Sequence, residues 1–307
     1  MSAGLALGAL VPALPPPWLQ PFAEFAFMRR ALVATLALAV GAAPLGCLLV
    51  LRRMSLAGDA MSHAVLPGAA VGYLVAGLSL PAMSAGGFVA ALAVALAAGW
   101  VTRRTPQRED ASFAALYLVA LALGVLIVSL RGSPVDLMHL LFGSVLAVDA
   151  AALRQVAAVT TLTLAVLAIV WRPLVLESAD PGFLRAVGGP GATVHAVFLG
   201  LLVAHLVSAF QALGTLMAVG LMMLPAASAR FWVTGLPAMV ALAAALGAVA
   251  GALGLLASYH AELPSGPCIV LACGAGYLLS VLFGRCGGVF TRRPPRPRAA
   301  PTPPRRG

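Results

Sequence analysis

The segment Arg52–Gly68 reads RRMSLAGDAMSHAVLPG, and it places two ionisable side chains, Asp59 and His63, inside an apolar run. An ionisable group inside a membrane-spanning helix costs about 2.5–3.5 kcal/mol on insertion scales, so such groups are candidates for function. The two residues lie four positions apart, and both side chains therefore project from one face of a helix. The segment predicts a membrane helix with a polar pair on one face.

The composition of the whole chain indicates that the lipid bilayer is its main solvent. Of the 307 residues, 62% are hydrophobic and 9% are charged, whereas about 25% of the residues of a soluble domain are charged. So few charges cannot cover a globule of this size with a surface that faces water. We therefore predict an all-α polytopic membrane protein.

Apolar runs of about 20 residues, the length that crosses a bilayer, recur along the chain. The eight clear runs are Ala31–Leu51, Leu56–Leu78, Pro81–Val101, Ser112–Leu130, Gln155–Trp171, Thr193–Phe210, Leu236–Ser258 and Gly266–Phe283. A ninth, Leu213–Ala229, is short and follows its neighbour directly, and Val135–Val148 has a length that favours a re-entrant or interfacial helix. These runs predict eight or nine transmembrane helices in one domain, residues 31–285.

The 19 basic residues are all arginine, and they give the chain a net charge of +10. Positive residues concentrate in the cytoplasmic loops of membrane proteins. Nine spans with the N-terminus outside place most arginine groups on one side, namely Arg52/Arg53, Arg103/Arg104/Arg108, Arg172/Arg185, Arg230 and the tail from Arg285 onward. We predict an extracytoplasmic segment at residues 1–30 and a disordered, Pro/Arg-rich cytoplasmic tail at residues 286–307. Nucleic-acid binding is not expected, because no aromatic-rich basic face accompanies the charge.

The absence of lysine from the sequence excludes two classes of active site. A P-loop needs the lysine of its G-x-x-x-x-G-K-[ST] motif on the phosphates, and a pyridoxal-phosphate enzyme needs a Schiff-base lysine. The chain is therefore not expected to be an enzyme, and ATP hydrolysis that drives it must take place on another chain.

Two interpretations of Asp59 and His63 follow from the residues alone. A carboxylate and an imidazole on one face can offer an oxygen and a nitrogen ligand to a divalent cation, while water or another helix completes the shell. Alternatively, Asp59 pairs with Arg52 or Arg53, and His63 only hydrogen-bonds to Asp59. Two ligands do not define a metal site, so both interpretations stay open.

The remaining histidines give weaker signals. His205 is the lone histidine of its span, which is more typical of a ring whose hydrogen bonds are satisfied by a neighbouring helix than of a metal ligand. Asp136 and His139 could line an external vestibule or simply face water. His195 begins a span beside a predicted cytoplasmic loop, and the sequence assigns it no role.

The predicted cytoplasmic segment Glu177–Gly191 carries the signals of a short helix of its own. Asp180 and Pro181 are typical of a helix start, and Gly188 with Gly189 of a helix end. Its apolar residues, Phe183, Leu184 and Val187, have helical spacing. Such a helix could contact a partner protein or rest on membrane lipid.

Several blocks of the sequence resemble the ABC-3 family of zinc and manganese permeases. The longest is Arg52–Ala64, preceded by APLG at 43–46. The others are FMRRA at 27–31, VDLM at 135–138 with LFG at 141–143, DPGF at 180–183 with Arg185-Ala186, GTL at 214–216 through LPAASAR at 224–230, and Gly266-Pro267. These separate blocks are spread over nearly the whole chain outside its tail, so the resemblance is specific.

This resemblance implies a homodimer of permeases around a central pathway, two ATP-binding subunits, and an extracytoplasmic metal-binding protein, in the bacterial plasma (inner) membrane. It implies that Asp59 and His63 bind the transported ion, zinc in the first place and otherwise manganese or iron, and that no cofactor is bound permanently. The ATPase would be contacted by the residues Asp180, Phe183, Leu184, Arg185 and Gly188, with Phe183 and Leu184 in a groove. Gly182 departs from the family, where an acidic residue is common. The alternatives to this function are a secondary metal transporter and a permease for metal chelates.

Overall fold

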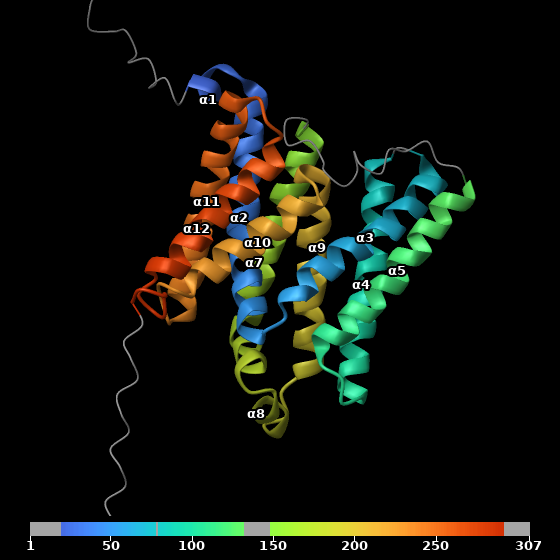
Figure 1. Cartoon of the computed structure of the whole chain (residues 1–307). Coiled ribbons are helices and arrows are strands. Elements are labelled where there is room, and N and C mark those ends of the chain that lie inside the picture. The colour runs from blue at the N-terminus through green and yellow to red at the C-terminus, as the bar shows by residue number, and fades with distance from the viewer. Residues whose placement is uncertain (1–19, 78, 132–147, 292–307) are drawn as a thin grey trace, which may run out of the picture.

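The computed structural model describes residues 20–77, 79–131 and 148–291, and all regular structure in these ranges is α-helical (Figure 1). The helices are α1 (Gln20–Glu24), α2 (Ala26–Arg52), α3 (Ser55–Ala76), α4 (Leu80–Arg104), α5 (Glu109–Arg131), α7 (Ala150–Ala179), α8 (Pro181–Ala186), α9 (Gly191–Leu213), α10 (Thr215–Ala229), α11 (Leu236–Ala261) and α12 (Ser265–Phe283). The predicted re-entrant segment Val135–Val148, with Asp136 and His139, lies outside the described residues except for Val148. So do residues 1–19 of the predicted N-terminal segment and residues 292–307 of the predicted tail.

All nine predicted spans coincide with helices. Seven of the described helices are long and apolar enough to cross a membrane, namely α2, α4, α5, α7, α9, α11 and α12. Helix α3 has 22 residues but is less apolar, because it carries Asp59, His63 and Pro67, and α10 has only 15 residues. The predicted all-α polytopic fold is confirmed.

The boundaries of α7 differ most from the prediction, which placed a span at Gln155–Trp171. The helix starts earlier because the Asp149 carboxylate accepts a hydrogen bond from the Ala152 N–H at 2.7 Å. It continues through Pro173 to Ala179. A proline removes one backbone hydrogen bond, but contacts of the extension offset the loss here, since Leu174 is buried and Glu177 forms an ion pair with Arg103.

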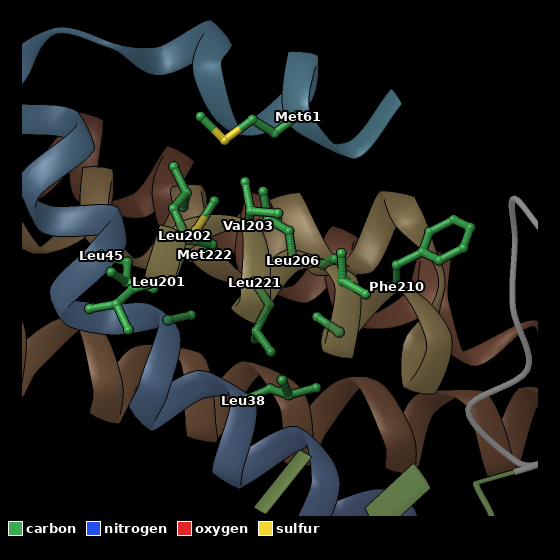
Figure 2. Packing of buried hydrophobic residues seen from close by; sticks show 14 of the residues in the cluster. Leu38, Leu45, Met61, Leu201, Leu202, Val203, Leu206, Phe210, Leu221 and Met222 are labelled. Carbon is green, nitrogen blue, oxygen red and sulfur yellow. The ribbon is translucent and has the colours of Figure 1, made fainter. Parts of the chain in front are cut away.

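The helices form two groups in Figure 1: α3, α4 and α5 run side by side, and the other long helices form a larger bundle beside them. Helix α9 is largely apolar, and most of its residues are buried, as expected of a helix inside a bundle. Figure 2 shows Met61 of α3 on one side of α9 and Leu38 of α2 on the other, with Leu202 and Leu206 of α9 between them. The hydrophobic core therefore joins α3 to the larger bundle through α9.

Two glycines set the close approach of α3 to α4. A Cβ atom on Gly68 would overlap the carbonyl oxygen of Gly86, and a Cβ atom on Gly86 would overlap the carbonyl oxygen of Gly68. Small residues at a helix contact let the backbones pack directly, which stabilises helix pairs in lipid. Helix α4 thereby fixes the part of α3 that follows His63.

The short helix α8 lies at one end of the molecule, and the turn between α4 and α5 lies at the same end, whereas α1 and the turn between α11 and α12 lie at the other (Figure 1). Arginines predicted to be cytoplasmic, at the end of α4 and on α8, thus share one end of the bundle. The cytoplasmic orientation of that end remains a prediction. Of the predicted tail, Cys286–Thr291 is hydrogen-bonded to the bundle, with the Cys286 N–H on the Phe231 carbonyl at 2.7 Å and the Val289 N–H on the Val281 carbonyl at 2.8 Å.

Candidate functional site

Asp59 and His63 project from the same face of α3, as their spacing predicts. The Nε2 atom of His63 lies 3.7 Å from Oδ1 of Asp59. This distance is too long for a hydrogen bond. In the single chain, the side chain of Asp59 is 56% exposed and that of His63 is 34% exposed. The pair is therefore accessible from outside the chain, although it sits on a helix packed within the bundle.

The pair opens into a cavity of about 350 Å³ between α3, α10 and α12. The other lining residues are Ser62, Thr215, Leu216, Val219, Gly220 and Val270. The ring of Tyr117 on α5 stacks on the imidazole of His63, with the centroids 5.8 Å apart and an angle of 26° between the planes. This stacking limits rotation of the imidazole, which lines a largely apolar cavity.

The geometry of the pair is compatible with a shared divalent cation. Metal bonds to imidazole nitrogen and carboxylate oxygen are about 2.1 Å long, so one ion can bridge two atoms up to about 4.2 Å apart. The observed 3.7 Å falls within this reach. No group of three or more His, Cys, Asp or Glu side chains that could hold a metal occurs among the described residues. Asp59 and His63 are therefore a pair of candidate ligands with no third such side chain grouped with them in this part of the chain.

The alternative partners of Asp59, the arginines of the α2–α3 junction, lie elsewhere. Arg52 donates from Nε to the hydroxyl oxygen of Ser178 at 2.9 Å, and its Nη1 lies 2.9 Å from Nδ1 of His195. Arg53 is exposed and forms no ion pair with Asp59. The interpretation in which an arginine neutralises Asp59 is therefore not supported.

The predicted short helix after α7 is present as α8. The carboxylate of Asp180 accepts a hydrogen bond from the Phe183 N–H at 2.9 Å and so caps the helix, and Pro181 occupies the first turn. The segment ends at Gly188, whose φ of +73° lies in the region that favours glycine. Arg185 is exposed, and its Nε donates to the Pro181 carbonyl at 3.1 Å.

The face that α8 presents outward differs from the prediction that Phe183 and Leu184 enter a groove together. Phe183 is 52% exposed and Val187 is 60% exposed, but Leu184 is only 4% exposed and packs towards Gly189 of its own chain. Consecutive helical residues point about 100° apart, whereas residues four apart share a face. The apolar pair available to a partner is therefore Phe183 with Val187.

A polar cluster between the ends of five helices was not predicted. It surrounds a cavity of about 460 Å³, and its members include Arg52, Arg103, Glu109, Glu177, Ser178 and His195. Nε2 of His195 lies 2.9 Å from Oε1 of Glu109, and Nη2 of Arg103 lies 3.3 Å from Oε1 of Glu177. The sequence shows only that polar residues lie at the ends of apolar runs. It does not show which helix ends pack together in the fold.

His205 packs against a neighbouring helix, but both of its ring nitrogens are buried without a hydrogen-bond partner among the described residues, which differs from the expectation of a hydrogen-bonded ring. It is 1% exposed, and its ring lies so close to Gly41 of α2 that a Cβ atom there would be 2.7 Å from Cε1. The lining of the Asp59–His63 cavity does not include it. His205 therefore belongs to the packing between α9 and α2.

Comparisons with known proteins place this geometry in context. The model of a family described as the ABC 3 transport family matches residues 24–284. The manganese transport system membrane protein MntC of Halalkalibacterium halodurans is 34% identical over 270 residues, which cover 88% of this chain and 91% of that protein. The chelated iron transport system membrane protein YfeD of Yersinia pestis is 30% identical over 274 residues, 89% of this chain and 91% of that protein. The solved structure of PsaBC from Streptococcus pneumoniae in complex with Fab matches with a TM-score of 0.75 and 31% identity, over 87% of this chain and 94% of that one.

Proposed function

Because the chain belongs to the ABC 3 transport family, and is a multi-pass permease of the bacterial plasma membrane for metal transport, we propose that it carries a divalent metal ion inward, with manganese as the first candidate. The two relatives described above are named for manganese and for chelated iron. Zinc, the metal first expected from the sequence, is therefore the second candidate. An Asp/His pair offers one hard and one intermediate ligand, which suits either ion.

The observation that carries this proposal is the Asp59–His63 pair in the lining of its cavity. A carboxylate in an apolar span is tolerated where something compensates its charge. The neighbouring arginine Arg52 contacts Ser178 and His195 instead. A transported cation supplies the compensation, and the 3.7 Å separation of the ligand atoms leaves it room.

The two-ligand shell also favours a second copy of the chain as partner. Asp59 is 56% exposed in the single chain, and Leu56, one turn before it, is exposed as well. A homodimer with α3 from each copy at its centre would close this surface and bring two Asp/His pairs to one pathway. An ATP-binding subunit pair would contact α8, and an extracytoplasmic metal-binding protein would deliver the ion at the opposite end.

In this mechanism the permease alternates between states that open to opposite sides of the membrane. Nucleotide binding on the ATPase can favour one state only if the contact at α8 differs between the two. Asp59 and His63 hold the ion briefly during the exchange. Their incomplete shell keeps the ion from being trapped as it would be in a closed four-ligand site.

The test is metal uptake into proteoliposomes that contain the complete complex. The binding protein delivers manganese, zinc or iron(II) to the complex in separate experiments. We expect uptake that needs ATP inside and the hydrolysing subunit, with manganese transported fastest and zinc as competitor. Uptake driven by a proton or sodium gradient without ATP would identify a secondary transporter instead. Uptake of a metal chelate but of none of the free ions would overturn the proposed substrate class.

A further inference from the structure

We propose that Arg52 is a positioning residue that couples α8 to the helix that bears Asp59 and His63. This inference rests on the proposed function, since it assigns a route by which the ATPase contact reaches the ion ligands. It is carried by three features of the structure: the place of Arg52 in the chain, the partners of its guanidinium, and the charges beside it.

Arg52 is joined to α3 by a short, well-defined turn. It is the last residue of α2, and α3 begins at Ser55. The turn is fixed by hydrogen bonds from the Arg53 N–H to the Val50 carbonyl at 3.3 Å and from the Met54 N–H to the Leu49 carbonyl at 3.0 Å. A displacement of Arg52 must therefore displace the start of α3, and Asp59 lies about one turn of helix beyond that start.

The guanidinium of Arg52 holds both chain segments that flank α8. Ser178 lies at the end of α7, directly before α8, and it receives the Nε–H at 2.9 Å. His195 lies near the start of α9, directly after α8, and its Nδ1 is 2.9 Å from Nη1. The ring of Phe198, one turn further along α9, lies 4.7 Å from the guanidinium carbon and fixes its plane. A force on α8 from either side thus reaches one side chain.

A neighbouring carboxylate offers this side chain an alternative partner. Nη2 of Arg52 and Oε2 of Glu177 are both buried without a hydrogen-bond partner among the described residues, and the two residues line the same cavity of about 460 Å³. A shift of α8 relative to α2 can therefore exchange the bond to Ser178 for a direct Arg52–Glu177 pair. Two discrete arrangements of one charged group are what a transmitted conformational change requires.

The same cluster ties in the helices beside α3. Glu109 at the start of α5 lies 2.9 Å from His195, and Arg103 at the end of α4 lies 3.3 Å from Glu177. The group formed by α3, α4 and α5 is thus held to the segments around α8 at this end of the molecule. Arg52 is the member of the cluster that continues directly into the helix with the ion ligands.

The experiment compares ATP hydrolysis with manganese uptake in proteoliposomes that contain the full complex. Arg52→Gln removes the planar, forked donor, and Arg53→Gln is the matched control, because Arg53 is exposed and adjacent. We expect Arg52→Gln to hydrolyse ATP within about twofold of the wild-type rate while the number of ions imported per ATP falls at least tenfold. Arg53→Gln should keep the wild-type ratio. Arg52→Lys should be intermediate, since a single ammonium cannot reach two partners as a fork does.

A second set of variants separates coupling from folding. Ser178→Ala and His195→Gln should each lower the ratio of ions to ATP. Ser178→Ala should not lower it further when combined with Arg52→Gln, because Ser178 acts through Arg52. The two single variants decide the matter if Arg52→Gln fails to assemble. An unchanged ratio in these variants, or a proportional loss of hydrolysis and uptake, would overturn the coupling role. Wild-type complex without ATP-dependent uptake would instead overturn the proposed function, and the coupling role with it.

Discussion

Burial separates the carboxylates of Asp59 and Glu177. The side chain of Asp59 is 56% exposed in the single chain and meets an imidazole, whereas that of Glu177 is 7% exposed and meets the guanidinium of Arg103. Removing one member of a buried ion pair leaves the other charge uncompensated. This costs more free energy of folding than the intact pair contributes. The two acids should therefore respond to mutation in different ways, Asp59 through transport and Glu177 through stability.

The Arg103–Glu177 pair should be asymmetric. Arg103→Ala leaves the buried Glu177 carboxylate without its partner and should cost about 1–3 kcal/mol. Glu177→Gln leaves an arginine that is 38% exposed and can reach water, so its cost should stay below about 1 kcal/mol. The measurement is the midpoint of thermal unfolding in detergent, with the exposed neighbour variant Arg104→Ala as control for the loss of charge. Equal shifts for Arg103→Ala and Arg104→Ala would show that the pair does not stabilise the fold.

Sequence separation explains which of these residues could be predicted. Asp59 and His63 are four positions apart, so helical periodicity alone placed them together. Arg52 is separated from Ser178 by 126 positions and from His195 by 143. Each of these residues looks like an ordinary span end, and only the packing of α2, α7 and α9 brings them into contact. From the sequence alone, His195 was therefore assigned no role, and Arg52 was one of two possible ion-pair partners of Asp59.

Among the helices, α8 gives the most direct prediction at the level of an element. Phe183→Asp with Val187→Asp places two charges on its exposed apolar face, where a protein partner would leave them desolvated at a cost of several kcal/mol. We expect this double variant to fold and reach the membrane but to lose ATPase binding, measured by co-purification. Leu184→Asp is the matched comparison: it buries a charge within the chain itself, so it should lower the yield of folded permease.

If the Phe183/Val187 variant retains the ATPase and normal uptake, α8 rests on lipid rather than on a partner. The choice of Val187 rather than Leu184 comes from the structure. The sequence identified all three apolar residues and both ends of α8, but the face turned towards the chain depends on how α7 and α9 hold the segment. Similarly, hydropathy located the span within α7 but not its end, because Pro173 is typical of a helix end and here lies inside the helix.

At the scale of the whole molecule, the arginine distribution predicts which end of the bundle faces the cytoplasm. An epitope inserted at Gly189, between α8 and α9, should be accessible in inverted membrane vesicles and protected in intact cells. An epitope after Glu262, between α11 and α12, should show the opposite pattern. Accessibility of the Gly189 epitope from outside intact cells would reverse the orientation and move α8 away from any cytoplasmic ATPase.

The central claim, that an ion passes the Asp59–His63 pair, is tested most directly by ATP-driven manganese uptake into proteoliposomes with permease variants in the full complex. Asp59→Asn and His63→Ala should each reduce uptake by at least about tenfold. Removing a residue that only orients a metal ligand already causes a loss of about this size, and these variants remove the ligands themselves. Assembly with the ATPase should stay normal, and Glu262→Gln, which removes an exposed acid outside the cavity, should transport like the wild type. Near wild-type uptake by both Asp59→Asn and His63→Ala, at matched protein levels, would contradict this account and leave the pair a structural feature of α3.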